Sequence, residues 1–201
     1  MKKSSVVKDA LILTVITLIA GALLGLVQQV TAKPIEEQQA KTKNAACLAV
    51  FENAADFEDV GFDAEAVAEK LEAEGITKTT VNSVTAAKSA DGSVIGYVVD
   101  VTNSEGYGGD IELMAGISDG GTVNGISFLS ISETAGLGMK AKEPEFKDQF
   151  SGLAAERVVL SKDNAEGTAV DAISGATVTS KAVVKCVNAA LLCAGLMEEA
   201  R

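Results

Sequence analysis

The sequence predicts an α+β protein, in which a single N-terminal transmembrane helix is followed by one domain with antiparallel hairpins and a C-terminal helix. Three observations predict this class: a long uncharged apolar run near the N-terminus, two pairs of alternating segments joined by short turns, and a final apolar stretch with a helical period. The chain has 201 residues, 47% of them hydrophobic and 22% charged, so it can bury one core and is too apolar for a disordered chain.

The uncharged run extends from Ala10 to Ala32. As a helix it would reach about 34 Å, which is enough to cross the roughly 30 Å hydrocarbon core of a bilayer. A cleavable signal peptide is the alternative, since Val30-Thr31-Ala32 has the small residues of a cleavage site. Signal peptides have a shorter apolar region of about 7–15 residues. We therefore expect an uncleaved membrane anchor.

Lysines flank this run on both sides, so their number does not decide its orientation. They are Lys2, Lys3 and Lys8 before the run, and Lys33, Lys41 and Lys43 after it. The N-terminal stub is short and its positive charge is more concentrated, so we expect the stub inside the cell and the domain outside. The predicted organisation is a stub over 1–9, a transmembrane helix over 10–32, a stalk or helical linker over 33–60, and the folded domain over 61–201.

Two strand pairs are predicted in the middle of the domain, where alternating apolar and polar residues surround turn residues. The turns contain Asp91-Gly92 and Asp119-Gly120-Gly121. The predicted hairpins pair 81–88 with 93–102, and 111–118 with 122–131.

Shorter elements are predicted around these hairpins. The acidic residues 56–61 are typical of a loop, and Asp63 is placed to cap a short helix that ends near Glu74, before Gly75. The remaining predicted elements are a helical segment over 140–150 interrupted at Pro144, short strands over 157–160 and 170–173, and a final helix over 179–199.

Composition excludes several classes of function. The net charge of −11 leaves no basic face for nucleic acid. The chain has no histidine, which removes Ser-His and Cys-His catalysis and His-ligated zinc or haem. Cys47, Cys186 and Cys193 form no CxxC pair, and the last two share one face of the final helix, so we expect small apolar core residues. We predict no catalytic residue and no metal site.

The chemistry-bearing segment is Asp171-Ala-Ile-Ser-Gly-Ala-Thr-Val-Thr-Ser180, where a strand-like run enters a turn of small residues just before the final helix. The first N–H groups of a helix have no partner inside it, and the helix dipole favours an anion there. Thr177 or Thr179 could equally cap the helix with its side chain. The residues alone therefore predict either an anion site or a simple helix cap.

Three motifs in this chain resemble those of a known family. Asp171–Thr177 (DAISGAT) is similar to the flavinylation motif of proteins that carry FMN through a phosphoester bond to threonine. Glu133–Gly138 (ETAGLG) resembles the family's ETPGLG loop, although Ala135 replaces a proline that would stiffen it. Gly106–Ile111 (GYGGDI) resembles its GYxGxI stretch. Over essentially its whole length the chain resembles the RnfG family, the FMN-binding subunits of the Rnf ion-translocating electron transport complex. That family is related to the FMN-carrying subunit of the sodium-pumping NADH:quinone reductase.

The resemblance implies a role for each motif residue. The folded domain would be an FMN-binding domain, with Thr177 as the residue that carries FMN covalently. A separate FMN transferase, with FAD as donor, would perform the attachment. The remaining cofactor-binding residues would be Asp171, Ser174, Gly175 and Ala176 as the frame of the motif, and Glu133, Thr134, Gly136, Leu137 and Gly138 around the flavin.

The resemblance also implies a function in electron transport. The chain would be a redox subunit of a membrane-bound translocase, not catalytic alone, that passes electrons between ferredoxin and NAD with movement of Na⁺ or H⁺. Its partners would be the other membrane and iron–sulfur subunits of the complex. Two alternatives remain. One is the FMN-carrying subunit of the sodium-pumping reductase, or another respiratory FMN-domain protein. The other is a membrane-anchored extracytoplasmic binding module without flavin.

Overall fold

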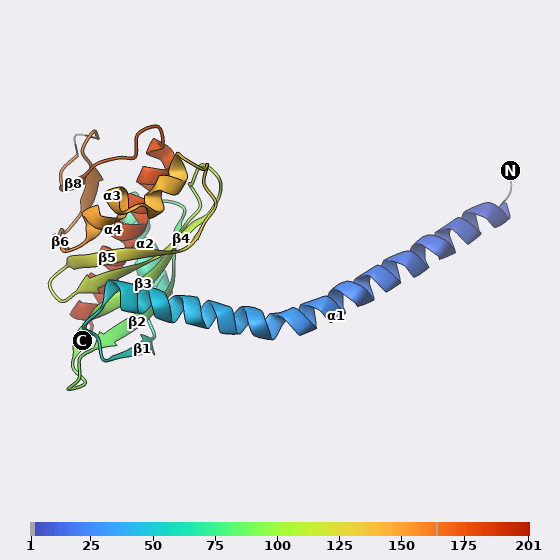
Figure 1. Cartoon of the computed structure of the whole chain (residues 1–201), viewed down its shortest axis with the longest axis horizontal. Coiled ribbons are helices and arrows are strands. Elements are labelled where there is room, and N and C mark those ends of the chain that lie inside the picture. The colour runs from blue at the N-terminus through green and yellow to red at the C-terminus, as the bar shows by residue number, and fades with distance from the viewer. Residues whose placement is uncertain (1–2, 164) are drawn as a thin grey trace. The chain divides into compact units, whose positions relative to one another are not determined.

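The computed structural model describes residues 3–163 and 165–201, with side chains from Lys8 onward. The chain divides into two compact units, Met1–Lys43 and Asn44–Arg201. Helix α1 (Lys3–Val50) makes up the described part of the first unit and continues into the second (Figure 1).

The described part of the first unit is a single helix that is largely apolar over residues 10–32. Its large apolar side chains from Leu11 to Val30 are exposed, and its most apolar window has a mean hydropathy of 2.7. The hydroxyl groups of Thr14 and Thr17 donate to the carbonyls of Ala10 and Leu13, at 2.9 and 3.1 Å, so these polar groups are satisfied within the helix. Such a helix is suited to a lipid environment, and the chain is expected to associate with a membrane.

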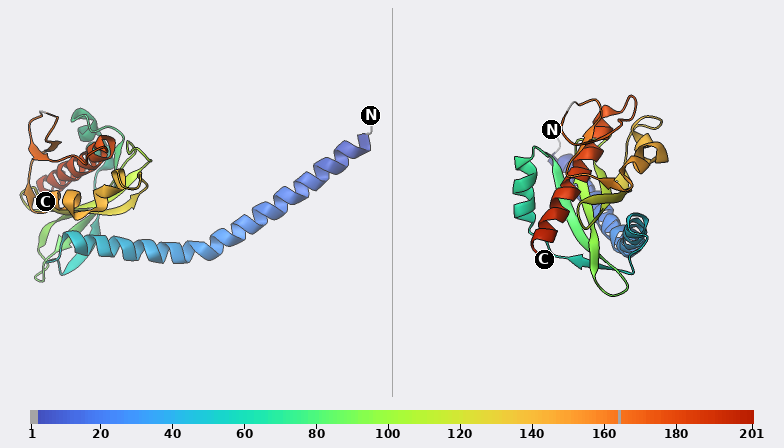
Figure 2. Two further views of the ribbon diagram at one scale, coloured as in Figure 1. Left: turned by 45° about the horizontal axis from the view of Figure 1, so that its top comes forward. Right: turned by 90° about the vertical axis from the view of Figure 1, so that its left-hand side faces the viewer.

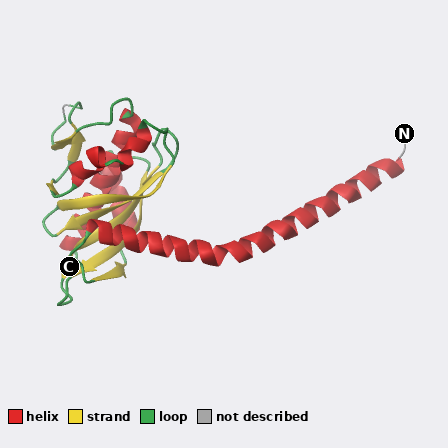
Figure 3. Cartoon of the chain, in the orientation of Figure 1, coloured by secondary structure: helices red, strands yellow, loops and turns green. Residues whose placement is uncertain are grey.

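The second unit is built on a six-stranded antiparallel sheet whose strands follow one another in sequence order (Figures 1 and 3). The two predicted hairpins are confirmed, because β2 pairs with β3 and β4 with β5. The strands are β1 (Asp56–Val60), β2 (Thr79–Lys88), β3 (Val94–Asn103), β4 (Ile111–Ser118), β5 (Thr122–Ile131) and β6 (Leu153–Ala154).

The prediction of a loop over the acidic residues 56–61 was wrong for 56–60, which form the edge strand β1. Phe57 and Val60 are partly buried and pack on opposite faces of the sheet, whereas Asp56, Glu58 and Asp59 face solvent. Charged residues are well tolerated on an edge strand, where they discourage pairing with another chain.

Helices cover both faces of the sheet within this unit (Figure 2). The larger core lies between one face and helices α2 (Ala64–Ala73) and α4 (Thr177–Glu199). Although α4 is apolar enough to span a membrane, 67% of its apolar window is buried, so it is a core helix. The last turns of α1 cover the other face, where Cys47, Val50 and Phe51 pack against the strands.

Cys186 and Cys193 are fully buried on α4, as the sequence predicts. Burial in apolar surroundings raises the pKa of each thiol to about 12. The Asp63 cap is also confirmed, since its carboxylate accepts hydrogen bonds from the backbone N–H groups of Glu65 and Ala66.

Short elements connect the sheet to α4. They are the 3₁₀ helices η1 (Gly138–Lys142) and η2 (Asp148–Phe150), helix α3 (Pro144–Lys147), and a parallel pair made of β7 (Val158–Leu160) and β8 (Thr168–Val170). The strand predicted over 170–173 ends at Val170, and the final helix begins at Thr177, two residues before the predicted start. Both differences arise because Ile173–Ala176 forms a tight turn, in which the N–H of Ala176 donates to the carbonyl of Ile173 at 3.0 Å.

Candidate functional site

Helix α4 begins with an open N-terminus. Ala176 is its N-cap residue, and no side chain among the described residues caps the first turn. The alternative in which Thr177 or Thr179 caps the helix is therefore wrong. Gly175 precedes the cap at φ +76°, a left-handed conformation that glycine adopts without strain, and this brings the chain sharply into the helix. The first N–H groups of α4 remain available to an anion.

The hydroxyl groups near this turn differ in accessibility. Ser180 is fully buried, where its Oγ accepts from the N–H of Ile173 at 3.0 Å and donates to the carbonyl of Ala176 at 2.9 Å. Thr179 is also buried. Thr177, the first residue of the helix, is partly exposed, and Ser174 is exposed. Only the latter two hydroxyls are open to a modifying enzyme.

A cavity of about 460 Å³ opens beside this helix start. The structure brings together two of the predicted motifs there: Glu133, Thr134, Leu137 and Gly138 from the segment after β5, and Gly175, Ala176 and Thr177 from the turn before α4. Its size is within the range of small-molecule sites. Sequence reasoning missed three further lining residues, Tyr107, Val178 and Thr179, of which Tyr107 belongs to the third motif.

Glu133 is the unusual residue of this cavity. The residue is only 8% exposed, and neither buried carboxylate oxygen has a hydrogen-bond partner among the described residues. Glycines make room for it, since a Cβ at Gly106 would lie 2.7 Å from Oε1 and a Cβ at Gly138 would lie 2.7 Å from Oε2. A buried carboxylate without a donor is costly, so its presence indicates a ligand that donates.

The rim of the cavity is apolar. Tyr107, Leu137 and Val178 are 75%, 44% and 49% exposed, and they are three of the four exposed large apolar side chains described after Lys43. Exposed apolar groups gathered at one place mark a binding surface. A flat aromatic ligand would find hydrophobic contacts with these side chains.

A basic group stands at the helix start. Lys162, in the loop between β7 and β8, donates from Nζ to Oγ1 of Thr177 at 2.6 Å. The site therefore combines a cation, free N–H donors and an unpaired carboxylate around one cavity.

Three predicted site residues lie outside this cavity. Asp171 and Ser174 line a separate cavity of about 440 Å³, together with residues of η1, α3 and η2. Asp171 is fixed there, because its N–H donates to Gln149 and its Oδ1 accepts from Ser161. Gly136 lines neither cavity and has φ +74°, so its contribution is to the conformation of the loop.

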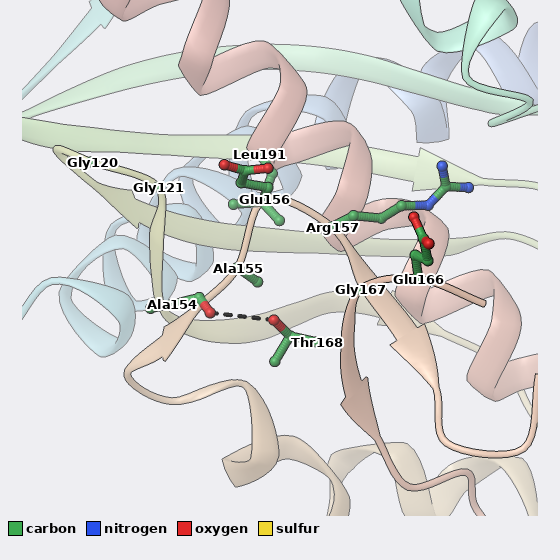
Figure 4. Close-up of a pocket in the computed structure, with 10 residues that line it drawn as sticks. All are labelled: Gly120, Gly121, Ala154, Ala155, Glu156, Arg157, Glu166, Gly167, Thr168 and Leu191. Carbon is green, nitrogen blue, oxygen red and sulfur yellow. Dashed lines mark hydrogen bonds between the residues drawn. The ribbon is translucent and has the colours of Figure 1, made fainter. Parts of the chain in front are cut away.

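Another cavity of the second unit, about 590 Å³, lies elsewhere (Figure 4). It lies between the β4–β5 turn, the segment 154–157 and the strand β8, and it contains none of the predicted site residues. Its charged side chains, Glu156, Arg157 and Glu166, are all exposed. Two of its lining residues are linked directly, since the Thr168 hydroxyl donates to the Ala154 carbonyl at 3.4 Å (Figure 4). This cavity has no buried polar group that would require a ligand.

Two protein families match this chain. The FMN-binding domain family matches residues 106–192, which include all three motifs, and the RnfG N-terminal region matches residues 1–50. The fold is also similar to the crystal structure of NqrC from Shewanella oneidensis, with a TM-score of 0.50 and 16% identity over 76% of this chain and 88% of that one.

Curated relatives match over nearly the whole length. The RnfG protein of the Na⁺-translocating ferredoxin:NAD⁺ oxidoreductase complex of Acetobacterium woodii is 38% identical over 187 residues, covering 91% of this chain and 88% of the relative. Its counterpart in the ion-translocating oxidoreductase complex of Methanosarcina acetivorans is 35% identical, covering 92% and 93%. The chain therefore belongs to the RnfG family of ion-translocating oxidoreductase subunits, and it carries that family's FMN-binding domain.

Proposed function

We propose that this chain holds FMN through a phosphoester bond to Thr177 and carries electrons within a membrane complex that links ferredoxin and NAD to Na⁺ or H⁺ translocation. The observation that carries the proposal is one cavity in which an uncapped helix start, an accessible threonine and a buried unpaired carboxylate meet. The match to an FMN-binding domain and the RnfG relatives support it.

The phosphate end of FMN fits the start of α4. A phosphodiester is an anion with strong acceptor oxygens, and the free N–H groups of the first turn are donors at the positive end of the helix dipole. The absence of a side-chain cap leaves these donors available to it.

The ring end of FMN fits the part of the cavity around Glu133. The ribityl hydroxyls and the ring N–H of FMN are donors, and Glu133 is an acceptor that lacks one. Tyr107, Leu137 and Val178 offer apolar surface to the flat ring system. When bound, FMN supplies reversible electron transfer, while the protein positions the cofactor and sets its potential.

Attachment needs a nucleophile and a base. Thr177 Oγ1 would form the new bond to the phosphorus nearest the flavin of FAD, the anhydride bond would break, and AMP would leave. The chain has no histidine, so we assign removal of the hydroxyl proton to the FMN transferase. Asp171 and Ser174 lie on the other side of the turn, where they frame the motif rather than contact the flavin.

We further propose the membrane arrangement: a stub over 1–9 inside, an uncleaved transmembrane helix over 10–32, a linker over 33–60, and the FMN domain over 61–201 on the extracytoplasmic side. The exposed apolar surface of α1 supports the anchor. The other membrane and iron–sulfur subunits of the complex are the proposed partners.

The test measures the gel fluorescence and the intact mass of the protein after expression with and without an FMN transferase. We expect a fluorescent band in a denaturing gel and an intact-mass increase of one FMN less one water only when the transferase is present. A colourless protein of unmodified mass in both cultures, with a positive control substrate labelled in the same cells, would instead favour a binding module without flavin.

A further inference from the structure

Three consecutive residues of the β7–β8 loop contact the flavinylation motif or the helix that follows it. The Ser161 hydroxyl donates to Asp171 Oδ1 at 2.7 Å, and Lys162 Nζ donates to Thr177 Oγ1 at 2.6 Å. This loop lies outside the motif in sequence, and its contacts hold the turn before α4 against the parallel strand pair.

The third contact shows that Lys162 and Lys181, the two lysines near the helix start, have different partners. Asp163 forms an ion pair with Lys181, one turn into α4, with 3.4 Å between Oδ2 and Nζ. Among the described residues, Lys162 has no carboxylate within ion-pairing distance, so its charge is directed to Thr177 and stays uncompensated. One lysine is thus neutralised and the other is left for an anion.

We propose that Lys162 is the positioning residue for the phosphate of the attached flavin: it orients the Thr177 hydroxyl before attachment and pairs with the phosphodiester afterwards. This inference rests on the proposed attachment at Thr177. An ammonium group is a donor only, so Lys162 occupies a lone pair of Oγ1 and leaves the hydroxyl proton free to be taken by a base of the transferase.

The charge balance supports the same assignment. When Thr177 Oγ1 bonds to the flavin-proximal phosphorus of FAD, AMP leaves with the electrons of the broken anhydride bond, and the remaining phosphodiester carries one negative charge. The Lys162 ammonium already contacts the oxygen that becomes the ester oxygen, so this charge forms beside a cation. Glu133, buried and unpaired, lines the same cavity and offers an acceptor to the donor groups of the cofactor.

The test compares Lys162→Met with the matched control Lys181→Met. Both variants remove one positive charge beside the helix start, but only the first removes a contact with Thr177. The initial rate of FMN attachment is followed by intact mass at fixed FAD and transferase. Long incubation then gives fully modified protein, for which melting temperatures with and without FMN and the ³¹P resonance of the phosphodiester are measured.

We expect Lys162→Met to slow attachment roughly tenfold, as loss of one charge-assisted hydrogen bond does. It should also reduce the rise in melting temperature that FMN gives and shift the ³¹P resonance. Lys162→Arg should restore all three, and Lys181→Met should stay close to wild type.

The inference would be overturned if modified Lys162→Met had the same FMN-induced rise in melting temperature and the same ³¹P resonance as wild type. Slower attachment alone would not support the inference, since loss of a contact with the transferase also slows attachment. Failure of the underlying proposal looks different, because wild-type protein would then carry no FMN on Thr177.

Discussion

Replacing Glu133 by glutamine removes the charge of the buried carboxylate and keeps its shape. In the protein without FMN, Glu133 is 8% exposed, and its buried carboxylate oxygens have no donor among the described residues. A buried group without a partner costs about 1–3 kcal/mol, and more when charged. We therefore expect Glu133→Gln to raise the free energy of unfolding of the flavin-free domain by about 1–3 kcal/mol, or about 2–4 °C in Tm for each kcal/mol in a domain of this size.

The same change should have the opposite consequence once FMN is attached. The variant loses a charge-assisted hydrogen bond to the cofactor, so the stabilisation that FMN provides should shrink. The assay is thermal unfolding of the detergent-solubilised full chain, before and after modification. The matched control is Asp110→Asn, an exposed acid of the neighbouring glycine-rich segment, which should change stability by less than about 0.5 kcal/mol.

A flavin-free Glu133→Gln variant that melts below wild type would refute this reasoning. It would mean that the carboxylate already has strong donors in the absence of the cofactor.

Three further predictions concern other parts of the chain. Gly136→Val should leave attachment intact but shift the flavin spectrum or midpoint potential, because valine is strained at φ +74° and the loop must move. A folded variant whose spectrum and redox titration equal those of wild type would place the loop away from the ring. The hydrogen bond from Lys185 lowers the pKa of Glu105, so this pair stabilises the fold above the unfolded carboxyl pKa of about 4.3 and loses its effect as pH falls through the lower folded value. The free energy of unfolding should therefore differ between wild type and Lys185→Met by about 0.2–1 kcal/mol at pH 7, and this difference should vanish in acid. A difference that stays constant with pH would contradict the pairing. The anchor over 10–32 should stay uncleaved with the domain outside, so an N-terminus at Lys33, or a protease-resistant domain in right-side-out vesicles, would contradict the arrangement.

The hairpins were predictable because their signals are local. Asp91-Gly92 and Asp119-Gly120 supply turns in which Gly92 and Gly120 have φ +84° and +85°, and alternating side chains on either side identify the strands. Strand β1 was missed because DFEDV is acidic, and its pairing depends on β2 far along the chain.

The site was predictable only in part, because its chemistry depends on contacts between distant segments. The motif and the resemblance locate Thr177 and Glu133, but nothing in the sequence indicates that Glu133 lacks a partner. Lys162 lies in a loop, where a lysine is usually solvated, and only the packing of that loop brings it to Thr177. Tyr107 was present in a recognised motif, yet its position at the cavity rim required the fold.

The central claim is covalent attachment at Thr177, and peptide mass mapping over residues 163–181 tests it most directly. Thr179 and Ser180 are buried, so the exposed Ser174 is the strongest rival. After co-expression with an FMN transferase, we expect the adduct on Thr177 in wild type and in the control Ser174→Ala, and no adduct in a folded Thr177→Ala variant. An adduct that persists in Thr177→Ala, or that maps to Ser174, would contradict the account.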